Sequence, residues 1–206
     1  MIGNKLEQSI IEVFQNDLSS THSINQVSKI LKKSYPIINK KSNIFLNEGV
    51  LKKINIGKSY QCFLDLNNEK ARVLMALNEI SRKESFAQKN KNSDILMDEL
   101  SQLSKKFRIE TVLLYKKSLI FVTPDVDKKD DMMQLSILTK DYTMLFLDRS
   151  RFQEYFVDNK DLQRYHIILL NVDLCLNMLS GVADRLLVSG IIKDDGSKNK
   201  EGKKNK

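Results

Sequence analysis

Residues 23–64 read SINQVSKILKKSYPIINKKSNIFLNEGVLKKINIGKSYQCFL and hold the signals that decide the fold of the first part of the chain. Ser23 followed by Gln26 is the pattern of a capping box, which predicts that a helix begins directly after Ser23. After a turn of about three residues, Ser34 can cap the next helix. Gly49 can adopt the left-handed conformation that ends a helix, so this helix should stop just before it.

A hairpin is predicted directly after that helix. The segments VLKKI and YQCFL are typical of short strands, and Gly57 in the intervening NIGKS can adopt the positive φ of a tight turn. Upstream, residues 5–18 place apolar side chains at helical spacing, which predicts a first helix. Three helices with a short turn between the last two, followed by a hairpin, are the elements of a winged helix-turn-helix domain.

The same stretch resembles the winged-helix DNA-binding domains that are common in archaeal and bacterial transcription regulators. Phe45, Gly49, Val50 and the run Gly57–Lys58–Ser59–Tyr60 stand at positions that match the helix end and the wing of that family. The resemblance covers roughly residues 5–80. It implies that the third helix enters the major groove of duplex DNA and that the hairpin grips the phosphate backbone beside it.

The third helix should have one face toward the core and an opposite, polar face. Ile38, Ser42 and Phe45 share the face that we expect to be buried. Asparagine can read adenine through two hydrogen bonds, and lysine or tyrosine can reach phosphates or base edges. The N-terminus of a helix also favours anions. The candidate DNA-contacting residues are Lys32, Lys33, Ser34, Tyr35, Asn39, Lys40, Asn43, Lys52, Lys53, Lys58 and Ser59.

The formal net charge of +8 is distributed unevenly along the chain. Residues 1–92 hold 15 Lys and Arg against 8 Asp and Glu, whereas residues 93–192 hold 13 against 15. This asymmetry favours a negatively charged partner for the first part of the chain, and double-stranded DNA is such a partner. The alternative is a winged-helix module that binds protein and whose lysines are only solvated.

The sequence predicts an α+β protein with two domains. Residues 1–83 form the predicted winged-helix domain, and the polar, unpatterned segment 84–92 is the predicted linker. In residues 93–192 strand-like runs alternate with helical ones, which predicts a small α/β domain. The final segment 193–206 is basic and too polar to form a core, so we expect a disordered tail.

The second domain resembles small nucleotidyltransferase-like domains in the order of its elements, from TVLLYK and LIFVTPD to TMLFLD and the helical region after it. Catalytic members carry Gly-Ser at the end of one strand and Asp-x-Asp on the next, whose carboxylates hold Mg²⁺ for phosphoryl transfer. Here Tyr115 and Lys116 replace Gly-Ser, Asp125 and Asp127 follow the strand instead of lying on it, and Asp148 ends a later strand. The resemblance implies a domain without catalytic residues, metal or cofactor. An active, antitoxin-like nucleotidyltransferase is the alternative.

Together these features predict a cytoplasmic DNA-binding protein, most naturally a transcription regulator. No apolar run approaches the roughly 18 residues of a membrane span, and the first residues lack the apolar region of a signal peptide. Regulators of this class commonly read two half-sites, so a homodimer is expected. The second domain would dimerise, bind a protein partner or bind a small-molecule effector. A chromosome or replication protein that binds DNA without sequence preference is a further alternative.

Overall fold

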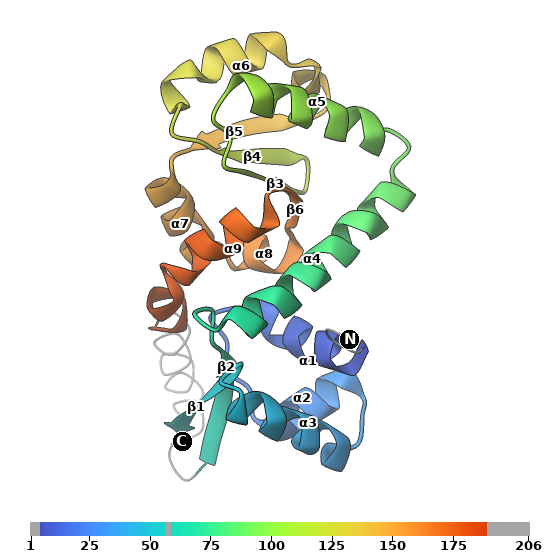
Figure 1. Ribbon diagram of the computed structural model, residues 1–206, viewed down its shortest axis with the longest axis vertical. Helices are drawn as coiled ribbons and strands as arrows, with labels where there is room; N and C mark the ends of the chain where they lie inside the picture. Colours follow the sequence, from blue (N-terminus) through green and yellow to red (C-terminus); the bar gives the residue numbers. More distant parts are fainter. Residues whose placement is uncertain (1–4, 57–58, 189–206) are drawn as a thin grey trace, which may run out of the picture. The chain divides into compact units, whose positions relative to one another are not determined.

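The computed structural model describes residues 5–56 and 59–188, which form an α+β fold (Figure 1). The described strands make one sheet of two strands and one sheet of four. The chain divides into two compact units: the first comprises the described residues of Met1–Met75 and Val182–Lys206, and the second comprises Ala76–Gly181. The predicted tail, residues 193–206, lies outside the described residues.

The first unit contains the helices and the hairpin in the predicted order. Its elements are α1 (Lys5–Gln15), α2 (Ile24–Leu31), α3 (Tyr35–Asn47), β1 (Leu51–Ile56) and β2 (Ser59–Leu64). The capping box that starts α2 is confirmed: Ser23 Oγ accepts a hydrogen bond from the Gln26 N–H at 3.2 Å, and the Ser23 N–H donates to Gln26 Oε1 at 2.7 Å. Gly49, with a φ of 72°, follows α3 as predicted.

The core of the first unit forms where α1, α3 and the hairpin meet. Ile38, Ser42 and Phe45 are buried, which confirms the predicted inward face of α3. The hairpin is tied to the segment between α1 and α2, because His22 and Cys62 exchange backbone hydrogen bonds of 2.9 and 2.8 Å. Further buried apolar side chains are Ile10, Ile11, Phe14, Val27, Val50, Leu51 and Leu74.

Helix α4 (Glu69–Lys89) contributes residues to both units, since the boundary between them falls after Met75. Asn68 caps its N-terminus, because the Asn68 Oδ1 accepts a hydrogen bond from the Ala71 N–H at 3.0 Å. An asparagine at this position satisfies one of the backbone N–H groups that the first turn of a helix leaves without an intrahelical partner.

The structure differs from the predicted linker and from the predicted domain limits. Residues 84–89 are helical and belong to α4. This stretch contains no glycine or proline, and Phe86 packs against the core of the second unit, so the helix continues although most of its other side chains are polar. Residues 182–188, which we predicted in the second domain, belong to the first unit.

The second unit is built on a mixed sheet with the strand order β5–β4–β3–β6. The central strands β3 (Thr111–Tyr115) and β4 (Ser118–Val122) are antiparallel; β6 (Ile167–Leu170) is antiparallel to β3, and β5 (Thr143–Leu147) is parallel to β4. The helices are α5 (Ser93–Lys106), α6 (Lys129–Leu135), α7 (Arg149–Asp158), α8 (Lys160–Tyr165) and α9 (Val172–Ser180). None of the described helices combines the length and the apolar character that crossing a membrane requires.

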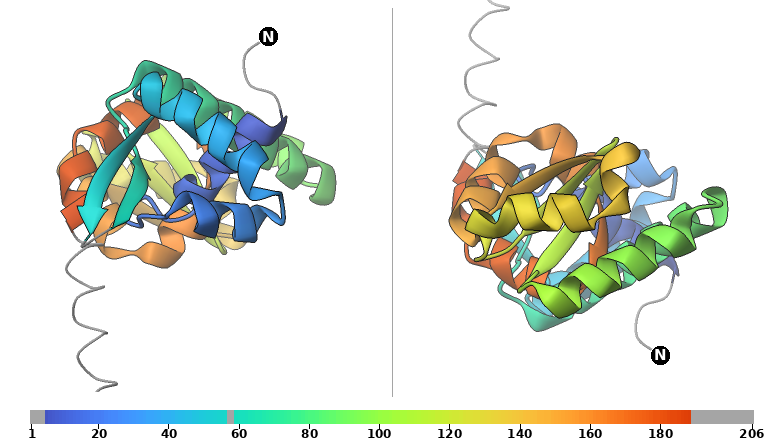
Figure 2. Two further views of the ribbon diagram at one scale, coloured as in Figure 1. Left: turned by 90° about the horizontal axis from the view of Figure 1, so that it is seen from below. Right: turned by 90° about the horizontal axis from the view of Figure 1, so that it is seen from above.

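Helices cover both faces of this sheet (Figures 1 and 2). On one face Leu100 of α5 and Met132 of α6 pack against the sheet, where the rings of Phe121 and Phe146 stack with centroids 5.1 Å apart. Helices α7 and α9 contact the strands from the other face. The buried side chains of these two helices include Phe152, Phe156, Cys175, Leu176 and Leu179.

Side chains of α4 cover the outer edge of β6. The Ile168 N–H donates to Glu79 Oε2 at 3.4 Å, and Lys83 Nζ donates to the Leu169 carbonyl at 2.8 Å. Glu79 is fully buried, and Arg82 Nη1 donates to its Oε1 at 2.9 Å. Backbone groups that an edge strand would present to another chain are therefore bonded within the second unit.

Candidate nucleic-acid interface

The turn between α2 and α3 holds the first candidate contact residues. Lys32 ends α2 in a left-handed conformation, with a φ of 51°. The Lys33 N–H donates to the Ser28 carbonyl at 3.1 Å, and the Ser28 hydroxyl donates to the Lys33 carbonyl at 2.9 Å. These bonds fix the turn, and Lys32, Lys33 and Ser34 are all exposed. Ser34 stands at the N-cap of α3, but its side chain makes no capping hydrogen bond.

The outer side of α3 carries amide groups and one lysine. Asn39 and Asn43 lie one turn apart, and Asn43 Nδ2 donates to Asn39 Oδ1 at 3.4 Å. Asn43 and Lys40 are exposed, whereas Asn39 is half-buried. The adjacent Lys41 points elsewhere, since its Nζ lies 2.8 Å from Glu7 Oε1 on α1. Among the described residues Lys40 has no ion-pair partner, so of these two lysines it is the one with a free ammonium group.

The hairpin carries Lys53 and Tyr60, and the start of α3 carries Tyr35. Lys53 Nζ lies 4.6 Å from the centre of the Tyr60 ring, which is a cation–π contact. Burial raises the pKa of Tyr60, and its neighbours Cys62 and Tyr35 raise it further. Tyr35 at the start of α3 thus acts electrostatically on the Tyr60 hydroxyl of the hairpin. We call Tyr35, Lys53 and Tyr60 the tyrosine–lysine patch, which joins two predicted contact residues from different elements.

Lys52 is separated from this patch. Successive residues of a strand point to opposite faces, so Lys52 and Lys53 diverge. Lys52 Nζ forms an ion pair with Asp65 Oδ2 at 2.8 Å. Both residues border a small cavity of about 100 Å³, which is also lined by Ala183 and Leu187 of the helical segment 183–188. The structure thus gives this lysine a partner within the first unit and does not group it with the other candidates.

The remaining candidates are Ser59 and Lys58. Ser59 is exposed at the start of β2. Lys58 and Gly57 lie outside the described residues. Tyr60 is not among the contact residues predicted from the sequence, although the cross-strand register of the hairpin points to it. Tyr60 pairs with Asn55, two residues beyond the Lys53–Cys62 pair, so it lies on the same face as Lys53.

Helices α2 and α3 also expose isoleucines that were not predicted as surface residues. Ile30 is 54% exposed, Ile37 is 53% exposed and Ile44 is 38% exposed. Ile37 and Ile44 are two helical turns apart, so they lie on one side of α3. Helical spacing was the signal that could have identified them, because neither residue falls on the buried face.

In the second unit two of the carboxylates singled out from the sequence have structural partners. Asp125 is buried, its Oδ1 accepts a hydrogen bond from Arg108 Nη2 at 3.1 Å, and its Oδ2 accepts one from the Arg108 N–H at 3.2 Å. These two bonds hold the pKa of Asp125 below its ordinary value. Asp148 caps α7 by accepting a hydrogen bond from the Arg151 N–H at 2.8 Å. Within the described part of the chain, no three His, Cys, Asp or Glu side chains gather as a metal site would require.

The turn that joins β3 to β4 consists of Lys116 and Lys117. Lys116 has a φ of 56°, the left-handed conformation that a tight turn often needs, and its Nζ lies 4.8 Å from the centre of the Tyr115 ring. The resemblance to nucleotidyltransferases places a Gly-Ser loop here, where the backbone would approach phosphates. A two-residue turn of lysines does not reproduce that loop.

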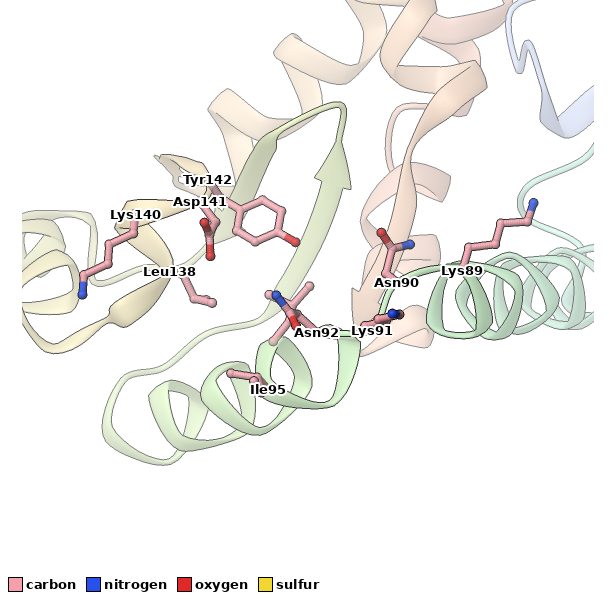
Figure 3. A pocket seen from close by; sticks show the side chains of 10 residues that line it. Lys89, Asn90, Lys91, Asn92, Ile95, Leu138, Lys140, Asp141 and Tyr142 are labelled. Atoms are coloured by element: carbon pink, nitrogen blue, oxygen red, sulfur yellow. The ribbon is translucent and has the colours of Figure 1, made fainter.

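A cavity of about 650 Å³ lies in the second unit beside the start of α5 (Figure 3). Asp141 and Leu138 point toward Asn92, whereas Lys89 and Lys140 stand at opposite ends and point away from one another (Figure 3). The cavity is large enough for a small molecule. The ammonium groups of Lys89 and Lys140 therefore do not meet at one point of the cavity (Figure 3).

Comparisons of the chain with protein-family models, with curated proteins and with solved structures find no match.

Proposed function

We propose that the first unit is a winged helix-turn-helix domain that binds duplex DNA, and that the protein is a transcription regulator. In this proposal α3 lies in the major groove, the turn before it meets the phosphate backbone, and the β1–β2 hairpin is the wing. Phosphate contacts would supply most of the affinity, and the asparagines of α3 would read bases.

One observation carries this proposal: the lysines around α3 differ in their partners. Lys41, Lys52 and Lys70 each lie 2.8 Å from a carboxylate of the first unit. Among the described residues Lys32, Lys33 and Lys40 have no such partner, and all three are exposed at the start or on the outer side of α3. Because Lys52 is paired with Asp65, we remove it from the candidate contacts. We add Tyr60, which contacts Lys53 on the same face of the hairpin.

The second unit is proposed to be a nucleotidyltransferase-like domain without catalytic residues that serves for association or for binding an effector. Support for this part is the order of its strands and helices and the structural use of Asp125 and Asp148. The cavity beside α5 is the place where a small-molecule effector would bind.

A second candidate function is protein binding through the same helices. The observation that favours it is the exposure of Ile30, Ile37 and Ile44, of which the last two lie on one side of α3, because neighbouring exposed apolar side chains often mark a protein interface. Replacing Ile37 and Ile44 by serine distinguishes the two functions. A DNA-binding surface should lose little affinity for DNA, whereas a protein interface should lose its partner.

The test of DNA binding is fluorescence anisotropy with a labelled random duplex at increasing salt. For the wild type, the logarithm of the binding constant should fall linearly with the logarithm of the salt concentration. The triple variant Lys32→Ala, Lys33→Ala, Lys40→Ala should bind more weakly, and its salt slope should be smaller by about 2.7, since each phosphate contact contributes roughly 0.9.

The matched control removes the same charge from the second unit by changing Lys105, Lys106 and Lys117 to alanine. These lysines are exposed and, among the described residues, have no ion-pair partner. The control should keep the wild-type salt slope. Absence of salt-sensitive binding by the wild type, or an equal loss in the control, would show that this surface is not a DNA-binding site.

A further inference from the structure

We propose that α3 selects duplex DNA rich in A·T base pairs, which it reads from the major groove. The amide row of the helix, which consists of Asn39, Asn43 and Asn47, contacts adenine. The exposed isoleucines beside it, Ile37 and Ile44, contact the methyl group of thymine. This inference rests on the proposed function, because it names the base pairs that the proposed DNA-binding helix prefers.

The amide row follows one side of α3. Its members are spaced by four residues, so they are neighbours along the helix surface. Asn43 and Asn47 are exposed, and Asn39 is half-buried. The bond from Asn43 Nδ2 to Asn39 Oδ1 is 3.4 Å, longer than the ordinary range of about 2.7–3.2 Å, so it is weak. An amide offers an acceptor and a donor together, and this pair matches the N6 donor and the N7 acceptor of adenine.

The same helix lacks the groups that favour guanine. Guanine presents two acceptors to the major groove, and arginine or lysine usually donates to them. The sequence of α3, YPIINKKSNIFLN, contains no arginine, and Lys41 Nζ lies 2.8 Å from Glu7 Oε1. Lys40 is one of the lysines proposed to contact phosphate. The outer side of α3 therefore offers amides where a helix that reads guanine usually offers guanidinium groups.

Ile37 and Ile44 match the thymine of an A·T pair. They are 53% and 38% exposed and lie two helical turns apart on one side of α3. Ile44 and Asn47 are three residues apart, so the apolar side chains border the amide row. Across the major groove an A·T pair presents N7 and N6 of adenine, then O4 and the methyl group of thymine. Adjacent amide and apolar side chains fit this order, whereas cytosine has no methyl group for an isoleucine to contact.

The first test compares labelled duplexes of equal length at one salt concentration by fluorescence anisotropy. They contain A·T pairs in mixed order, G·C pairs, or inosine·C pairs, which resemble G·C in the major groove but lack its minor-groove amino group. The wild type should bind the A·T duplex about tenfold more tightly than the other two, since one bidentate contact supplies roughly that discrimination. Equal binding of the inosine·C and A·T duplexes would indicate minor-groove reading and overturn the inference.

The same measurement separates this inference from the function on which it rests. Equal affinity for the A·T and G·C duplexes, with salt-sensitive binding of both, would overturn the base preference and leave the proposed DNA binding intact. Failure to bind any of the duplexes at low salt would overturn both.

The second test changes single groups of the bases and needs no protein variant. In the A·T duplex, 7-deazaadenine removes the N7 acceptor, and uracil in place of thymine removes the methyl group. Binding should weaken about fivefold for one lost hydrogen bond and about fourfold for one lost methyl contact. A preference for A·T that both changes leave intact would come from the shape of the duplex and would contradict base reading.

Matched variants assign each contact to its residue, with circular dichroism as the check of folding. Asn43→Ala should lose most of the preference for adenine over 7-deazaadenine and keep the wild-type salt slope, because the amide carries no charge. Asn177→Ala, which removes an exposed amide from α9 in the second unit, should keep the preference. The double variant Ile37→Ala, Ile44→Ala should bind thymine and uracil duplexes equally while its affinity for random duplex stays close to that of the wild type. A full adenine preference in Asn43→Ala would show that the amide row does not read the base.

Discussion

Replacing Glu79 by alanine should destabilise the second unit severely. The Glu79 side chain is fully buried, its Oε1 accepts a hydrogen bond from Arg82 at 2.9 Å, and its Oε2 accepts one from the Ile168 N–H at 3.4 Å. Alanine would leave the partly buried guanidinium without this carboxylate and the N–H of β6 without its acceptor. Removing one partner of a buried charged pair typically costs about 3–5 kcal/mol, out of a total of about 5–15 kcal/mol for a domain.

Two further variants separate the charge from the hydrogen bonds. Glu79→Gln keeps an oxygen that can accept from Arg82 or from Ile168, so it should cost less, about 1–3 kcal/mol. Glu84→Ala changes an exposed carboxylate on the same helix and should stay within about 0.5 kcal/mol of the wild type. Urea unfolding followed by circular dichroism, with linear extrapolation to water, gives the three free energies of unfolding.

The same carboxylate should control the pH dependence of stability through His166. Burial lowers the pKa of His166, and the charge of Glu79, 3.7 Å from its Nε2, acts in the opposite direction. Below about pH 6.5 the unfolded histidine binds a proton more readily than the folded one, so the free energy of unfolding falls with decreasing pH. Glu79→Gln should steepen this fall between about pH 7 and pH 5. The structural role assigned to Glu79 is refuted if Glu79→Ala lowers the free energy of unfolding by no more than Glu84→Ala does.

Other residues give shorter predictions. Gly49→Ala should cost about 1 kcal/mol, seen as a lower melting temperature, because the glycine has a φ of 72°. Native Cys62 and Cys175 should react with Ellman's reagent far more slowly than the unfolded protein does, because both thiols are buried and burial raises the pKa of each. Asp125→Asn should weaken the acid dependence of unfolding. The bonds from Arg108 keep the pKa of Asp125 low, so their stabilising effect is present near neutral pH and is lost as the pH falls through the lowered pKa.

The ends of the helices in the first unit could be predicted because their signals are local. Ser23 and Gln26 form the capping box within four residues of chain, and Gly49 adopts its left-handed conformation where the helix must stop. The predicted linker is wrong because the contact that decides it is not local. Residues 84–89 are polar on most sides, and the contact that makes them part of a helix is made by Phe86 with distant residues.

The candidate contacts show where local reasoning ends. Lys52 and Lys53 are adjacent lysines that the sequence does not distinguish. Strand geometry directs Lys52 to Asp65 and Lys53 to Tyr60. Lys40 and Lys41 differ in the same way, since Glu7 on another helix takes one of them. The sequence contains the charges, whereas the partner of each charge depends on which elements pack together.

The bonds that cover β6 also bear on how the chain folds. Glu79 is 89 residues before Ile168, and Lys83 is 86 residues before Leu169. The β3–β4 hairpin, by contrast, is closed by two residues. Long loops close slowly, so the edge of β6 should be among the last features to be protected during folding. Until α4 arrives, an apolar strand with open hydrogen-bonding groups is accessible to other chains. Refolding yield should therefore decline as protein concentration rises, even though the native edge is covered.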